Sequence, residues 1–126
     1  LATVQRWLQQ GLIGPGGHVD FVLGVPGAMP GTPQALMYLL SQLPAGFSWT
    51  VAGIGAAQLT LNTLGIALGG HVRVGFEDNL YLRKGEKATR NAQFVQRVAQ
   101  IARLLERPVA TPDQARQILR RASGGR

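Results

Sequence analysis

Three ionisable side chains stand close together at the end of an apolar run, in a region where charge is otherwise scarce. Arg73, Glu77 and Asp78 fall within six residues, whereas residues 1–70 contain only Arg6 and Asp20 among all Lys, Arg, Asp and Glu. Charged groups at the end of a buried strand are costly to remove from water unless they are paired or bound to a metal. The cluster therefore predicts either a functional centre or a structural ion pair.

The spacing of these residues indicates the chemistry that they could carry. Side chains alternate along a strand, so Arg73 and Glu77 share one face. Asn79 ends the apolar run, and a turn there would bring Asp78 over the same end of the strand. One carboxylate would then suit a divalent metal as an oxygen ligand, and the other would suit a base that Arg73 keeps ionised and oriented. A structural ion pair between Arg73 and one acid is the alternative.

Three further features admit both a functional and a structural interpretation. The loop at residues 24–32 precedes a predicted helix and could hold an anion with its backbone N–H groups, or could simply connect two elements. Gln58 follows the second predicted strand and could donate to a ligand, although close backbone packing explains the glycines around it equally well. His18 and His71 each precede a strand, at the end opposite the acidic cluster, and we interpret both as structural or surface residues.

The elements that position these residues follow a repeated pattern. Apolar, glycine-bounded runs at 18–25, 48–54 and 71–76 predict buried parallel strands. Helices are predicted at the start of the chain, over residues 1–8, and at 34–40, 57–68 and 91–106, and a last one begins after Thr111-Pro112. The order α-β-α-β-α-β-α-α predicts an α/β fold, namely the last three βα units of a TIM-type (β/α)8 barrel, which needs about 250 residues. We expect residues 1–126 to be the C-terminal portion of one barrel domain whose N-terminal half lies outside this chain.

Composition limits the classes of function. The chain has no cysteine, which excludes a disulfide framework and a thiolate zinc site, and no apolar run approaches the roughly 20 residues that span a bilayer. No signal peptide is visible, and we expect a cytoplasmic protein without a membrane partner. The whole net charge of +7 comes from residues 71–126. Binding of nucleic acid or another polyanion is therefore a second hypothesis, but arginines spread along the predicted helix at 91–106 favour a solvated face over a nucleic-acid surface.

Several motifs occur in an order that resembles a known family. They are FVLGVPG at 21–27, SWTVAGIG at 48–55, GGHVRVGFEDNLY at 69–81, KGE at 84–86, NA at 91–92 and VATP at 109–112. Together they resemble the C-terminal half of the β-keto acid cleavage enzymes. That resemblance implies a zinc-dependent β/α barrel that converts a β-keto acid and acetyl-CoA into acetoacetate and a new CoA thioester.

The resemblance also implies roles for individual residues. Glu77 would bind zinc together with a His-x-His pair on an early strand, a pair that this sequence lacks. Asp78 and Arg73 would form the catalytic dyad that starts proton removal. We assign no residue to acetyl-CoA, the expected co-substrate. The expected partners are the β-keto acid, acetyl-CoA, the missing N-terminal half and further copies in a homo-oligomer. We expect the chain to be inactive alone, and an inactive barrel fragment is a third hypothesis.

Overall fold

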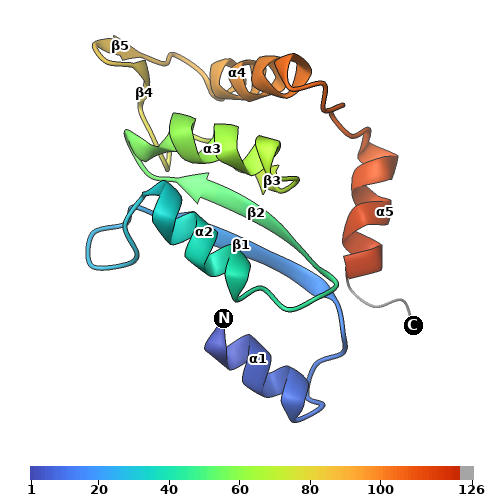
Figure 1. The fold of residues 1–126 in the computed structure, drawn as a ribbon. Coiled ribbons are helices and arrows are strands. Elements are labelled where there is room, and N and C mark those ends of the chain that lie inside the picture. Colours follow the sequence, from blue (N-terminus) through green and yellow to red (C-terminus); the bar gives the residue numbers. More distant parts are fainter. Residues whose placement is uncertain (123–126) are drawn as a thin grey trace.

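A three-stranded parallel sheet lies at the centre of the computed structural model, which describes residues 1–122 (Figure 1). Its strands are β1 (Gly17–Leu23), β2 (Phe47–Gly53) and β3 (His71–Val72), in the order β1-β2-β3. Phe21 of β1 is paired with Val51 of β2, and Val51 is paired with Val72 of β3. The predicted α/β class and the first two strands are confirmed.

The third strand is much shorter than the predicted run at 71–76. Beyond Val72, the Arg73 N–H still donates to the Val51 carbonyl at 3.0 Å, and the chain then leaves the sheet. The N–H groups of Asp78 and Asn79 both donate to the Gly75 carbonyl at 3.1 Å. The turn therefore begins at Gly75, before the position that Asn79 suggested, because the Gly75 carbonyl accepts these two N–H groups from within the turn.

Residues 1–122 form five helices, of which α2, α3 and α5 contact the sheet strands, and the starts of two of them follow the capping residues in the sequence. They are α1 (Ala2–Gln9), α2 (Pro33–Ser41), α3 (Ala57–Ala67), α4 (Asn91–Leu104) and α5 (Pro112–Ala122). The Thr32 hydroxyl accepts from the Ala35 N–H at 3.3 Å, and the Gln114 side chain accepts from the Thr111 N–H at 2.9 Å. Such contacts satisfy N–H groups that the first turn leaves free, so the predicted starts of α2 and α5 are confirmed. Within residues 1–122, no helix combines the length and the apolar character needed to cross a membrane.

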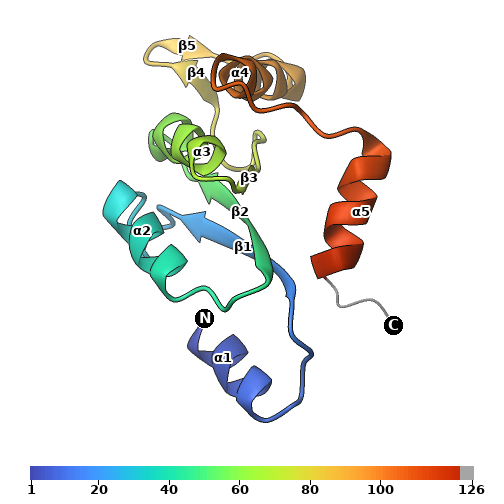
Figure 2. The ribbon, with the colours of Figure 1, turned by 45° about the vertical axis from the view of Figure 1, so that its right-hand side comes forward.

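The two faces of the sheet differ sharply in polarity. Alternate side chains of β1 and β2, with α2 and α3, form the buried core, which comprises Phe21, Leu23, Ala35, Leu36, Trp49, Val51 and Leu61. Each large apolar side chain buried in this way contributes about 1.5–3 kcal/mol. The intervening positions carry polar groups, namely His18, Asp20, Ser48, Thr50, His71 and Arg73. The sheet therefore places its functional candidates on the face opposite α2 and α3, while α5 contacts β1 and β2 near their amino ends (Figures 1 and 2).

An antiparallel hairpin that the sequence analysis missed follows the acidic turn. It consists of β4 (Tyr81–Arg83) and β5 (Glu86–Lys87), joined through Lys84 and Gly85. Gly85 has a φ of +82°, a left-handed conformation that glycine adopts without steric cost. The hairpin lies beside α3 and α4 in both ribbon views (Figures 1 and 2).

The prediction that the arginines form a solvated face is wrong for two of them. Arg97 of α4 donates to the Leu82 carbonyl of the hairpin and to Gln58 of α3. Arg107 donates to the carbonyls of Ile66 and Gly69 at 2.8 Å each, where α3 ends. Cations near a helix C-terminus satisfy carbonyls that have no partner within the helix. These two arginines therefore hold neighbouring elements together and do not form a free basic surface.

Candidate active site

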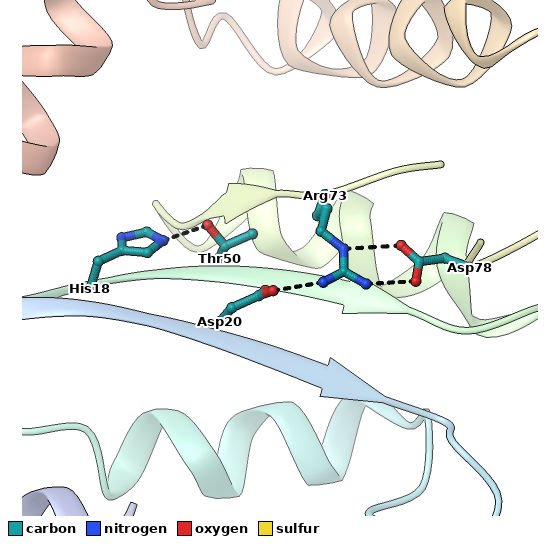
Figure 3. Close-up of polar contacts among 5 residues, drawn as sticks. All are labelled: His18, Asp20, Thr50, Arg73 and Asp78. Carbon is teal, nitrogen blue, oxygen red and sulfur yellow. Dashed lines mark hydrogen bonds and ion pairs between the residues drawn. The ribbon is translucent and has the colours of Figure 1, made fainter. Parts of the chain in front are cut away.

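The short turn after β3 brings Asp78 directly against Arg73. The Arg73 Nε donates to Asp78 Oδ2 at 3.1 Å, and Nη2 donates to Oδ1 at 2.7 Å, which makes a bidentate pair (Figure 3). Asp78 is only 5% exposed. The sequence analysis predicted that Arg73 would pair with an acid, and the acid is Asp78. Both oxygens of this buried carboxylate are held by one planar guanidinium, a geometry that fixes its orientation.

A third residue, Asp20, joins the cluster from the edge strand β1, on the same face of the sheet. The Arg73 Nη1 donates to Asp20 Oδ2 at 2.9 Å, so this guanidinium links β1 to the turn after β3 (Figure 3). Sequence reasoning gave Asp20 no role. One sequence feature could have pointed to Asp20: it is the only acid in residues 1–70, and it interrupts an apolar strand. The pairing of the strands, which cannot be read from the sequence, brings Asp20 within reach of Arg73.

The electrostatics of the cluster favour a permanently charged arginine. Hydrogen bonding to Asp78, followed by the negative charges of Asp78 and Asp20, raises the pKa of Arg73 above its ordinary value despite partial burial. The Arg73 and Asp20 side chains are 40% and 37% exposed, so their ion pair contributes only about 0–1 kcal/mol to stability. The Asp20 contact therefore matters more for orienting Arg73 than for holding the fold together.

Glu77 does not join this pair, and its side chain is exposed at the surface. Its carboxylate folds back against Gly75, where a Cβ would collide with it. Among residues 1–122 no group donates a hydrogen bond to Glu77 or forms an ion pair with it. A carboxylate that is free of protein partners can serve as an oxygen ligand for a metal, whereas Asp78 has both oxygens engaged.

These residues alone do not make a complete zinc site. Catalytic zinc uses three protein ligands of the His, Glu, Asp and Cys types. Within the described residues 1–122, no three such side chains come together in a possible metal-binding group. Glu77 fits the role of one ligand, and any others would have to come from outside the described part of the chain.

The two histidines lie near the amino ends of the strands, on the same polar face. The ring nitrogens of His18 lie 2.8 Å from the hydroxyls of Ser48 and Thr50, and its ring centroid is 5.9 Å from that of His71. The prediction that each histidine precedes a strand is wrong, because His18 lies within β1 and His71 is the first residue of β3. Burial, followed by the nearby charges of Arg107 and His18, lowers the pKa of His71. Both histidines belong to a structural polar layer.

The acidic turn is held from behind by a buried polar network. Gln58 is fully buried, and its Oε1 accepts from Asn79 Nδ2 and Arg97 Nη2 at 3.2 Å each. The Gly55 N–H donates to the Asp78 carbonyl at 2.7 Å. A Cβ on Gly53 would lie 2.7 Å from the Gln58 Cα, so α3 packs closely on the end of β2. The close packing at Gly53 is thus observed, while Gln58 Nε2 is buried without a hydrogen-bond partner in residues 1–122, so donation by Gln58 stays a prediction.

The loop at 24–32 also serves the fold. The Gly24 N–H donates to the Met29 carbonyl at 2.9 Å, and the Ala28 N–H donates to the Val25 carbonyl at 3.0 Å. These internal bonds engage the N–H groups of Gly24 and Ala28, which are then not available to an anion. The connecting-turn interpretation is therefore the better one.

Comparisons with known proteins identify the family of this chain. The family described as beta-keto acid cleavage enzyme matches residues 1–120, and the chain belongs to that family. It is 48% identical over 114 residues to a 3-keto-5-aminohexanoate cleavage enzyme of Fusobacterium nucleatum, covering 90% of this chain and 41% of that protein. It is 45% identical over 102 residues to the enzyme of the same name from Acetoanaerobium sticklandii, covering 81% of this chain and 37% of that protein.

A third relative differs in its named substrate. The chain is 42% identical over 114 residues to a 3-oxoadipate:acetyl-CoA acetyltransferase of Cupriavidus necator, covering 88% of this chain and 40% of that protein. The chain thus spans about two fifths of the length of these relatives. The family resemblance inferred from the sequence motifs is confirmed.

Proposed function

We propose that this chain is the C-terminal part of a (β/α)8 barrel that cleaves a β-keto acid with acetyl-CoA. The products would be acetoacetate and a CoA thioester of the remaining acyl group. The observation that carries the proposal is the buried, bidentate Asp78–Arg73 pair beside the unpartnered Glu77, at the carboxyl end of a parallel sheet. In β/α barrels, catalytic groups gather at this end of the strands. The relatives' names, which include cleavage enzymes and an acetyl-CoA acetyltransferase, support the same chemistry.

In this proposal Asp78 is the base. It would take a proton from the carbon between the carboxylate and the keto group of the β-keto acid. The resulting carbanion attacks the thioester carbonyl of acetyl-CoA and the CoA thiolate leaves. The thiolate then adds to the original keto carbonyl, and the carbon–carbon bond breaks so that the acyl group remains on CoA. The departing acetoacetate carbanion takes the proton back from Asp78, which regenerates the base. Arg73 keeps Asp78 oriented throughout.

Glu77 would hold zinc together with a His-x-His pair supplied by the N-terminal half. When bound, that ion would act as a Lewis acid toward the keto oxygen of the substrate. An N-terminal half would also complete the sheet, since β1 and β3 are each paired on one side only within residues 1–122.

The test is a transfer assay with the full-length protein that contains this chain. A panel of β-keto acids is incubated with acetyl-CoA, and new CoA thioesters are identified by mass. We expect one class of β-keto acid to give both the thioester and acetoacetate in equal amounts. Absence of any new thioester across neutral, acidic and amino-substituted β-keto acids would contradict the proposal.

A further inference from the structure

Helix α4 holds the acidic turn on its amino side. The Phe76 N–H, directly before Glu77, donates to Asn91 Oδ1 at 2.9 Å, and Asn91 is the first residue of α4. The start of α4 is itself fixed, because Gln93 Oε1 accepts from the Thr89 N–H at 2.7 Å. A side-chain oxygen of the helix therefore fixes the backbone at the residue that precedes Glu77.

Helix α3 holds the carboxyl side of the same turn. Asn79 Nδ2 donates to Gln58 Oε1 at 3.2 Å and to the Tyr81 carbonyl at 2.7 Å, and Asn79 Oδ1 accepts from the Tyr81 N–H at 2.9 Å. Gln58 Oε1 has a second donor in Arg97 of α4. The turn and both helices thus meet at this one oxygen, directly after Asp78.

The backbone between these two contacts carries neighbouring carboxylates in different environments. Asp78 is buried, with both oxygens on the Arg73 guanidinium, and its carbonyl accepts from the Gly55 N–H at 2.7 Å. Glu77 is exposed and has no partner in residues 1–122. A reacting group displaced by about 1 Å can lose about 10² in rate, so the position of this backbone matters for both acids.

Packing alone does not account for an amide at position 58. Burying a polar side chain costs free energy unless it forms hydrogen bonds, and an apolar side chain could fill the same space. Gln58 is fully buried, its Oε1 accepts two hydrogen bonds, and its Nε2 has no partner in the described chain. The presence of the amide is therefore explained by the groups that its oxygen holds.

We propose that Asn91 and Gln58 are positioning residues for the acidic turn. Asn91 holds the backbone before Glu77, the proposed metal ligand. Gln58 acts through Asn79 on the backbone that carries Asp78, the proposed base. This inference rests on the proposed function, which gives the two acids their roles. Both positioning residues act as hydrogen-bond acceptors, so a carboxylate of the same length should replace either amide.

The first experiment uses Asn91 variants of the full-length protein. In Asn91→Ala we expect zinc affinity, measured by competition with a chelator, to fall about 10–100-fold, the usual effect of losing a group that orients a ligand. Asn91→Asp keeps an oxygen acceptor and should restore the affinity. Gln96→Ala is the matched control, because Gln96 is exposed on the same helix and its side chain forms no hydrogen bond within residues 1–122. Unchanged affinity in Asn91→Ala, or an equal loss in Asn91→Asp, would overturn the role of Asn91.

The second experiment uses Gln58 variants. Gln58→Met removes the shared oxygen and fills nearly the same volume, and we expect kcat to fall about 10–100-fold with KM for the β-keto acid unchanged. Gln58→Glu keeps the acceptor, gives Arg97 a charged partner and should restore kcat. An equal loss of kcat in both variants, or no loss in Gln58→Met, would overturn the role of Gln58.

Hydrogen exchange separates this inference from the proposed function. The exchange rate of the Phe76 amide is measured by NMR in the metal-free full-length protein, in Asn91→Ala and in Asn91→Asp. We expect faster exchange in Asn91→Ala alone, and the same rate in all three proteins would contradict the inference. If that pattern is found but the wild type cleaves no β-keto acid, the proposed function fails and the positioning of the turn by Asn91 stands.

Discussion

Asp20 and Arg73 form an ion pair of 2.9 Å across the sheet, although 53 residues separate them in the chain. Arg73 thereby holds the turn with Asp78 on one side and strand β1 on the other. A guanidinium fixed at three nitrogens has little freedom to rotate, so Asp78 is presented in one orientation. We infer that the Asp20 contact is a positioning contact for the proposed base.

Replacing Asp20 tests this role. In the full-length protein, Asp20→Asn keeps the shape of the side chain but removes its charge, and we expect kcat to fall about fivefold, the equivalent of ~1 kcal/mol, with KM for the β-keto acid unchanged. Asp113→Asn is the control, since Asp113 pairs with Arg116 on the exposed surface of α5. A larger change in KM than in kcat would show that Asp20 contacts substrate and does not act through Arg73.

Glu77 and Asp78 are adjacent, yet their environments predict opposite defects. In the full-length protein, Glu77→Gln removes an exposed, unpartnered carboxylate, so we expect loss of bound zinc, measured by metal analysis after dialysis. Asp78→Asn should retain zinc while turnover falls by about 10²–10⁴, the range for a general base. Zinc retained by Glu77→Gln at wild-type stoichiometry would remove Glu77 from the ligand set.

Much of this arrangement can be predicted from the sequence because it depends on residues that are close together in the chain. The caps at Thr32 and Thr111, the strands around Val22 and Val51, and the pairing of Arg73 with a nearby acid depend on short spacings and on alternation. The sequence alone predicts those features, and the structure contains them.

The features that sequence reasoning missed depend on contacts between distant segments. Asp20 reaches Arg73 only through the register of three strands, and Arg97 leaves the solvated face only because the hairpin and Gln58 offer it oxygens. The hairpin itself is short, with strands of three and two residues, too few to give a periodic pattern. The length of β3 was overestimated for a related reason, since apolar character persists beyond the point where pairing stops.

His71 makes the stability of the fold depend on pH. Burial lowers its pKa below the unfolded value of 6.5, so the folded state disfavours its protonated form. Stability from the neutral form is present above pH 6.5 and is lost as pH falls through the lowered folded-state pKa. We expect the urea midpoint of the protein to fall between pH 7.5 and pH 5.5, and His71→Gln to reduce that fall. The same fall in wild type and His71→Gln would assign the effect to other groups.

The open edges of the sheet predict the behaviour of residues 1–126 expressed alone. Both β1 and β3 are paired on one side only within residues 1–122, and unpaired edges with apolar side chains tend to pair with other chains. We expect self-association, measured by size-exclusion chromatography with light scattering. A single species of 13.5 kDa that unfolds cooperatively would show that the segment is a self-sufficient domain.

The most direct test of the proposed chemistry follows the acetyl group. The full-length protein is supplied with acetyl-CoA carrying ¹³C in both acetyl carbons and with an unlabelled β-keto acid that it accepts. The account predicts that the label appears in the methyl and keto carbons of acetoacetate, that the new CoA thioester is unlabelled, and that Asp78→Asn slows the formation of both products by about 10²–10⁴. Label that stays on CoA, or an Asp78→Asn variant that transfers it at the wild-type rate, would contradict the assignment of Asp78 as the base.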